Sequence, residues 1–171
     1  MTATELLKEK TIKPKEKTFL LSKLILEGSL TSGELMEIAN TSGDPIKATC
    51  IEALEFATLK NPHIIDQNLV HFIVESINAK APRVKWESAK VITNIAHLYP
   101  NDLEQAIENL LLNAKHKGTV VRWSAANALR AITALKSQHN VDLLLQMEIL
   151  CENEEKDSIR KIYQDALKRH A

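Results

Sequence analysis

The sequence is poor in the residues that interrupt helices. It contains 4 glycines and 5 prolines among 171 residues, and aromatic residues make up only 4%. Glycine and proline are unfavourable inside helices, so their scarcity, together with abundant Ala, Leu, Ile, Lys and Glu, indicates a helix-rich chain. No segment alternates apolar and polar residues strictly enough to predict a strand. A chain of this length can bury a substantial core.

An excess of charge of either sign is also missing. Lys and Arg total 22, Asp and Glu total 22, and the formal net charge is zero. A domain that binds polyanions generally is usually clearly basic, so nucleic acid is a disfavoured partner, although a local basic patch stays possible. No apolar run has the length of a signal peptide core or a membrane span. We therefore expect a cytoplasmic protein with no membrane segment.

Cysteines and catalytic motifs are sparse. The two cysteines, Cys50 and Cys151, lie far apart in helical patterns, which favours reduced core thiols over a disulfide. The six histidines form no H-E-x-x-H motif and no Cys/His cluster at zinc spacing. There is no glycine-rich phosphate loop, nucleophile elbow or kinase motif. The sequence predicts no catalytic residue, no cofactor and no metal, and therefore a protein that is not an enzyme.

One nine-residue pattern is present four times, at residues 46–54, 84–92, 121–129 and 159–167. Its basic residue falls at positions 47, 85, 122 and 160, so the intervals are 38, 37 and 38 residues. A fixed period in this range indicates a stack of similar units instead of a single closed core. Stacked repeats usually present binding surfaces, which is a second reason to expect no enzyme.

Helix start and stop residues divide the chain into short helices. Thr2 and Thr31 are each followed three residues later by glutamate, the capping-box spacing, and Asp44 precedes Pro45 as a helix cap. Short connections make consecutive helices antiparallel, so the helices pair into five hairpins. The predicted helices span residues 3–11, 15–28, 31–41, 45–60, 64–79, 83–98, 101–116, 119–136, 139–153 and 157–170.

The repeated pattern places one apolar arc on the second helix of each hairpin. In the third unit Val121, Ala125, Ala128, Leu129 and Ile132 fall on this arc. The small residues allow a neighbouring helix to approach closely, and the larger ones fill the space between. The corresponding residues of the first two units are Ile46, Cys50, Ala53, Leu54 and Ala57, and Val84, Ser88, Val91, Ile92 and Ile95.

The segment from Val121 to Ile132, Val-Arg-x-x-Ala-Ala-x-Ala-Leu-x-x-Ile, resembles the second helix of a HEAT repeat, in the wider HEAT-like class. The first unit adds the familiar Asp44-Pro45 pair before its pattern. The fourth unit departs from the family, because Tyr163 replaces a small residue and His170 stands where isoleucine is expected. Tetratricopeptide repeats match less well, because their period is about 34 residues and their Trp/Gly/Tyr pattern is missing.

The resemblance covers residues 31–171 and implies an architecture. It implies an all-α fold, a right-handed α-α superhelix of about five antiparallel helical hairpins. We expect residues 1–171 to form a single HEAT-like repeat domain, with residues 1–30 as an atypical N-terminal capping unit.

The resemblance also implies that the second helices line a concave surface. The outward-facing residues of these helices are the candidates for partner binding: Trp86, Lys90, Trp123, Asn127, Arg130 and Lys161. Trp and Arg are favoured contact residues because they combine a large area with directional polar groups. A second interpretation stays open, in which the two tryptophans pack against each other or a neighbouring helix.

Two further rows of charges follow the repeat. The outward face changes from acidic at Glu52 and Glu55 to basic at Lys161 and Lys168, which would orient a dipolar partner or form an ordinary solvated face. The recurring basic residue of the pattern, at 47, 85, 122 and 160, is interpreted as structural, because in HEAT-like repeats it pairs with a carboxylate or carbonyl of a neighbouring unit.

The leading hypothesis is a non-enzymatic scaffold or adaptor that binds a protein or peptide on the concave face. The alternative is a DNA-binding protein resembling the HEAT-like alkylation repair glycosylases, which hold damaged DNA with concave tryptophans, basic residues and an acidic residue. The neutral charge, the short chain and the lack of a placed catalytic acid count against it. A third possibility is a subunit or fragment of a larger HEAT assembly. The sequence determines neither the partner nor the oligomeric state.

Overall fold

The computed structural model describes all residues 1–171 and contains ten α-helices and no strand. The helices are α1 (Ala3–Lys8), α2 (Pro14–Leu26), α3 (Ser32–Thr41), α4 (Asp44–Lys60), α5 (Gln67–Ser76), α6 (Pro82–Ile95), α7 (Glu104–Asn113), α8 (Thr119–Thr133), α9 (Asn140–Asn153) and α10 (Asp157–Arg169). Three short 3₁₀ turns lie at Pro62–Ile64, Ala96–Leu98 and Pro100–Asp102. None of the helices combines the length and apolarity that a membrane crossing requires.

Of the three helix caps named from the sequence, two are confirmed and one is wrong. Both predicted capping boxes form, at Thr2 and at Thr31. Gly28 adopts a φ of 74° just after α2, a conformation that glycine takes without steric cost. The predicted cap at Asp44 is wrong: Gly43 is the capping residue and Asp44 is the first residue of α4. The negative charge of Asp44 still favours the positive end of the helix dipole.

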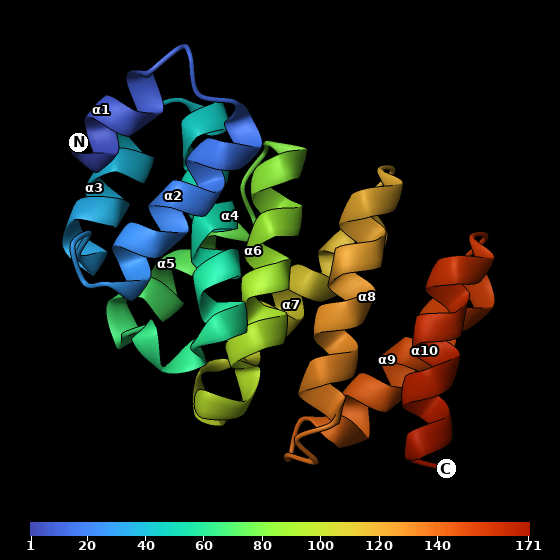
Figure 1. Cartoon of the computed structure of the whole chain (residues 1–171). Helices are drawn as coiled ribbons and strands as arrows, with labels where there is room; N and C mark the ends of the chain where they lie inside the picture. Colours follow the sequence, from blue (N-terminus) through green and yellow to red (C-terminus); the bar gives the residue numbers. More distant parts are fainter.

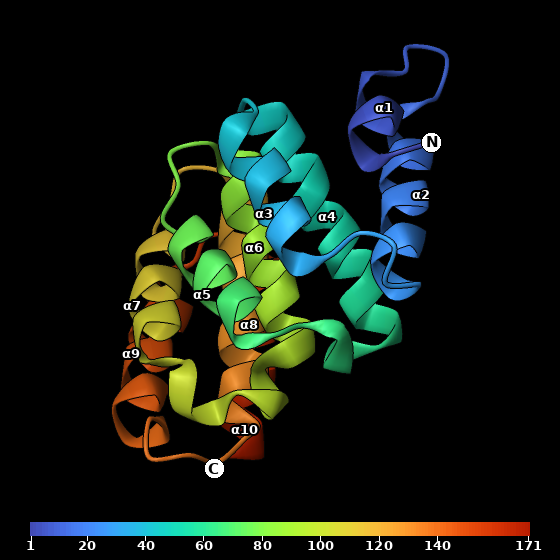
Figure 2. The same cartoon turned by 90° about the vertical axis from the view of Figure 1, so that its left-hand side faces the viewer.

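The ten helices form five consecutive hairpins, as predicted. The second helices α2, α4, α6, α8 and α10 stand side by side in sequence order and form one layer (Figure 1). The first helices α3, α5, α7 and α9 form the other layer (Figure 2). The fold is therefore an all-α, HEAT-like helical solenoid, which confirms the predicted fold class.

The predicted apolar arcs are buried. In the third unit none of the five arc residues is more than 1% exposed, and in the first unit only Ile46 is half-buried. Forty-three buried apolar residues form one continuous cluster from Ala3 to Ala166. Core contacts thus pass from each hairpin to the next. The expectation of a single domain over residues 1–171 stays a prediction, which limited proteolysis would test.

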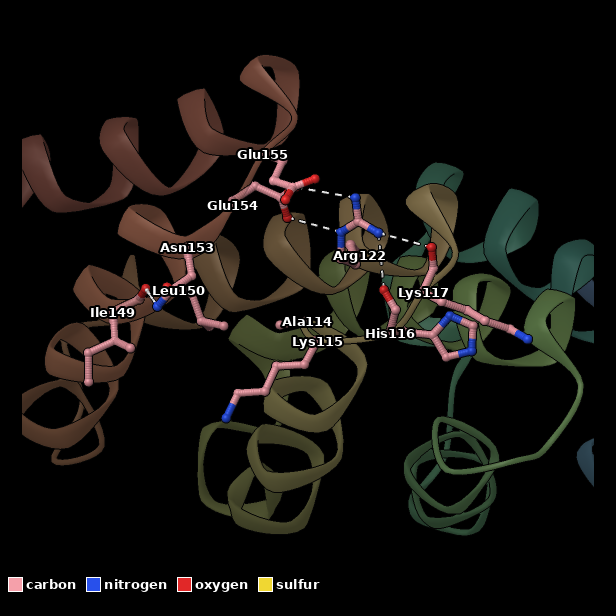
Figure 3. A pocket seen from close by; sticks show the side chains of 10 residues that line it. All are labelled: Ala114, Lys115, His116, Lys117, Arg122, Ile149, Leu150, Asn153, Glu154 and Glu155. Carbon is pink, nitrogen blue, oxygen red and sulfur yellow. Dashed lines mark hydrogen bonds and ion pairs between the residues drawn. The ribbon is translucent and has the colours of Figure 1, made fainter.

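The recurring basic residue has a structural role. Arg122 contacts both carboxylate oxygens of Glu154 in the next hairpin, at 3.1 and 3.3 Å, and donates to the carbonyls of His116 and Lys117 (Figure 3). Two earlier equivalents bond differently: Lys85 donates to the Asn113 side chain at 3.1 Å, and the Lys47 ammonium lies 5.2 Å from the centre of the Phe72 ring. A bidentate, largely buried Arg–carboxylate pair fixes the relative position of two units.

Tyr163 marks the departure of the last hairpin from the others. It stands at the position of Cys50, Ser88 and Ala125 in the earlier units, and it is completely buried. Its hydroxyl has no hydrogen-bond partner, and burial raises its pKa above the usual value. A bulky ring thus occupies an interface that small residues form elsewhere. The ring fills space, while its buried, unpaired hydroxyl is unfavourable.

We expect Tyr163→Phe to raise the free energy of unfolding by about 1 kcal/mol, because it removes an unsatisfied buried hydroxyl without opening a cavity. Tyr163→Ala should lower it by about 3–5 kcal/mol, because the ring is fully packed. Urea unfolding of the three proteins at 25 °C measures both changes. A less stable phenylalanine variant would mean that the hydroxyl is bonded in solution.

Candidate functional site

The six candidate residues lie on one surface. Trp86 and Lys90 belong to α6, three others to α8, and Lys161 to α10. Because each second helix packs against the next, equivalent positions on successive helices form neighbouring rows (Figure 1). None of the six side chains is fully buried. We call the solvent-facing side of α4, α6, α8 and α10 the second-helix surface.

The two tryptophans of this surface differ in their surroundings. Trp123 is 43% exposed, and its indole N–H makes no hydrogen bond within the chain. Trp86 is half-buried, and its indole N–H donates to the Glu87 carboxylate at 2.9 Å. Packing and a hydrogen bond therefore hold Trp86, whereas Trp123 presents its ring to solvent.

Two buried carboxylates share one lysine beside Trp86. The Lys90 ammonium lies 3.5 Å from Oε2 of Glu87 and 3.8 Å from Oε2 of Glu55 on the neighbouring helix. Glu55 is 8% exposed and Glu87 is 4% exposed, and neither Oε2 atom accepts a hydrogen bond. One ammonium cannot balance two ionised carboxylates, so the Glu55–Glu87–Lys90 cluster has one negative charge in excess when fully ionised.

The surroundings of this cluster favour protonation of its carboxyl groups. Burial raises the pKa of Glu55; the Lys90 charge lowers it, and repulsion from Glu87 adds to the rise. Burial also raises the pKa of Glu87, against the opposing effects of Lys90 and the bond from Trp86. A carboxyl group that keeps its proton above the usual range can donate a hydrogen bond or a proton.

Sequence reasoning missed Glu87 and misjudged Glu55. The positions equivalent to Glu87 in the other units hold Thr49, Ser124 and Ile162. A comparison of the units would therefore have shown that only the second unit has an acidic residue at this position. Glu55 was expected on the solvated acidic face, yet it is buried. α4 packs between α2 and α6, and the Lys90 ammonium of α6 lies 3.8 Å from the Glu55 carboxylate.

The expected change from acidic to basic charge is largely neutralised. Glu52 accepts hydrogen bonds from Arg83 at 2.8 Å and from the Thr18 hydroxyl at 3.0 Å. Arg130 is held by Asp165 at 3.4 Å and by the Asn127 side chain at 2.8 Å. Arg83, Lys90 and Arg130 therefore pair with carboxylates on neighbouring helices. Among the six candidate residues, Trp123 and Lys161 are the two whose side chains make neither a hydrogen bond nor an ion pair.

Other reactive groups of the chain are inert or scattered. Burial raises the pKa of the Cys50 thiol to about 12, which makes it a poor nucleophile. No group of three or more His, Cys, Asp and Glu side chains has a geometry that could hold a metal ion. The Glu55–Glu87–Lys90 cluster is thus the group of interacting titratable side chains at the second helices in which the pKa values of two buried carboxylates are shifted.

No protein-family model matches the sequence, and no curated protein does either. Solved structures of similar fold exist. A chain of the complex of CpcE and CpcF of phycocyanin lyase from Nostoc sp. PCC7120 matches with a TM-score of 0.67 and 13% identity, over 96% of each chain. The crystal structure of an engineered protein matches with a TM-score of 0.61 and 14% identity, over 97% of this chain and 94% of the other. At such identities these matches show the fold alone.

The first match contradicts the prediction that the chain is not an enzyme. That prediction depended on the rule that stacked helical repeats present surfaces instead of catalytic groups. A phycocyanin lyase, which is an enzyme, shares this fold, so the rule does not hold here. The fold is compatible with either kind of function, and only the residues of a site can decide between them.

The cluster gives a pH-dependent prediction. Because the pKa values of Glu55 and Glu87 are raised in the folded chain, folding takes up protons that the unfolded chain releases above pH 4.5. The free energy of unfolding should therefore fall as pH rises from 4.5 through the raised pKa values. Glu87→Gln removes one of the two charges and keeps an acceptor for Trp86, so it should reduce this fall.

Urea unfolding at pH 5 and pH 8, performed on the wild type and on Glu87→Gln, tests the prediction. Glu75→Gln is the control, because Glu75 is exposed on α5 and should leave the pH dependence unchanged. An identical pH dependence in wild type and Glu87→Gln would contradict the prediction, because it would show that the pKa of Glu87 is the same in the folded and the unfolded chain.

Proposed function

We propose that the chain binds a protein or peptide segment on its second-helix surface, with Trp123 as the anchor. The observation that supports this best is the exposure of Trp123, which is 43% accessible in the middle of the layer of second helices. Tryptophan is the residue type most enriched among strong contact residues, because it buries a large rigid area at low entropic cost. Because the exposed indole makes no hydrogen bond and its helix packs against its neighbours, the ring is already in place to contact a partner.

The charges around Trp123 suggest the chemistry of the bound segment. Lys161 lies at the position equivalent to Trp123 on the neighbouring helix, is exposed and has no ion pair. The Arg130 guanidinium is held in place by Asn127 and Asp165. A segment with an apolar or aromatic side chain over Trp123 and a carboxylate near Lys161 complements these groups.

The comparison with solved structures supports a protein as the kind of partner. The phycocyanin lyase structure is a complex of two proteins, CpcE and CpcF, and the fold therefore occurs in a protein assembly. A solenoid of this kind suits the role of a scaffold or adaptor, because its helices present an extended surface. The identity of the partner does not follow from this likeness.

The DNA-binding alternative is less well supported. Basic residues of the second-helix surface are already paired with carboxylates: Arg83 with Glu52, Arg130 with Asp165, and Lys90 with the buried Glu55 and Glu87. Binding to a phosphate backbone requires unpaired cations, since affinity comes from the release of counterions. We therefore favour a protein or peptide partner.

We expect Trp123→Ala to lower the affinity for a bound peptide by about 2 kcal/mol while the helix content stays unchanged. A phage library of random 12-residue peptides, selected on the immobilised wild-type chain, supplies the ligand. Fluorescence anisotropy with the enriched synthetic peptide measures the affinity, and circular dichroism checks the fold.

Leu112→Ala is the matched control, because Leu112 is an apolar residue, 64% exposed, on α7 in the other layer. It should bind the selected peptide as the wild type does. The proposal fails if no enriched peptide depends on Trp123, or if both variants lose affinity equally.

A further inference from the structure

Side-chain hydrogen bonds connect some neighbouring first helices of the solenoid and are missing between others. Between α5 and α7 two asparagine side chains donate to backbone carbonyls: Asn109 to Val74 at 3.1 Å and Asn113 to Ile77 at 3.0 Å. One period of 37 residues later the equivalent positions on α9 hold Gln146 and Leu150, and neither donates to α7. The hydrogen bonds that join α5 to α7 are therefore missing between α7 and α9.

A groove follows the seam between α7 and α9, which lie side by side (Figure 2). Two hollows of about 260 and 480 Å³ lie along it, the first near the N-terminal ends of the two helices and the second near their C-terminal ends. In the second hollow Ile149, Leu150 and Asn153 of α9 face Ala114 and Lys115 at the end of α7 (Figure 3). The apolar side chains that line the groove are Ile107, Leu111, Ala114, Leu143, Ile149 and Leu150.

The outer face of α9 beside this groove is apolar. Val141, Leu145 and Ile149 are spaced four residues apart and are 75%, 57% and 52% exposed. The equivalent positions are Gln67, His71 and Glu75 on α5, and Glu104, Glu108 and Leu112 on α7. An apolar stripe thus appears on α9 where the same row of the solenoid is mainly polar. Contiguous exposed apolar residues of this kind mark interaction sites.

The charges of the groove differ between its two ends: Glu104, Glu108 and Asp142 line the first hollow, whereas Lys115, Lys117 and Arg122 line the second together with Glu154 and Glu155. α7 and α9 contain Glu104, Glu108, Asp142, Glu148 and Glu152, and neither helix contains Lys or Arg. All five acidic side chains are exposed, and none forms an ion pair within the chain. At the acidic N-terminal end of the groove two copies of this face would repel each other, whereas the basic residues of a partner would be attracted.

We propose that this groove binds an amphipathic helix of another protein, with its apolar side on α9 and its Lys or Arg residues near Glu104, Glu108 and Asp142. The dimensions are suitable: α7 has 10 residues and α9 has 14, or about 15 and 21 Å at 1.5 Å per residue, which accommodates a helix of three to four turns. Such binding uses apolar side chains at helical spacing as anchors and flanking charges for selectivity. The site is separate from the second-helix surface and independent of the function proposed for it.

Two labelled 14-residue helical peptides test the proposal by fluorescence anisotropy. Both have leucine at one helical face, and the remaining positions are lysine in one and glutamate in the other. The wild-type chain should bind the lysine peptide and not the glutamate peptide. Leu145→Ser with Ile149→Ser should weaken binding at least about tenfold, and Glu104→Lys with Glu108→Lys should favour the glutamate peptide instead.

Trp123→Ala is the control that separates the two surfaces, and it should bind the lysine peptide as the wild type does. Equal binding of the lysine peptide by wild type and by the Leu145/Ile149 double variant would overturn the proposal, because attraction by charge alone would explain it. Sedimentation of the unliganded chain gives the remaining outcome. Self-association that the same double variant abolishes would identify a second copy as the occupant and would also overturn the proposal.

Discussion

The close approach of successive second helices is the constraint on which the rest of the structure depends. Cys50, Ser88 and Ala125 stand at one position of the repeated pattern, and each is at most 1% exposed. Small side chains there allow helix axes to approach to about 8–10 Å, so that ridges and grooves interlock in one register. The register fixes which residues face the core, and it therefore also fixes which residues reach solvent in neighbouring rows.

Two features of the molecule follow from this register. Where this register is kept, charged groups of adjacent helices meet as ion pairs, as between Arg83 and Glu52 at 2.8 Å, and a row of surface charges becomes a paired network. Where the last unit departs from it, with Tyr163 in place of a small residue and Leu150 in place of an asparagine, the hairpins meet differently. The groove between α7 and α9 lies at this departure.

The sequence predicted the helices and their buried arcs well, because both depend on local spacing that can be read along one helix. It predicted less about the site, because burial and pairing depend on neighbouring helices. Nothing in the α6 pattern alone indicated that Glu87 would bond to Trp86 and share Lys90 with a residue of α4. The inference from fold to the absence of enzymatic activity was wrong for a different reason, since one fold supports many kinds of chemistry.

Acrylamide quenching of Trp123 fluorescence tests the central claim, that the outward half of the repeated pattern forms the binding surface. In a Trp86→Phe variant Trp123 is the only tryptophan, and it is 43% exposed in the free chain. The account predicts strong quenching of the free protein and marked protection when the selected peptide is bound. Equal quenching with and without saturating peptide would contradict it, because the peptide would then bind elsewhere.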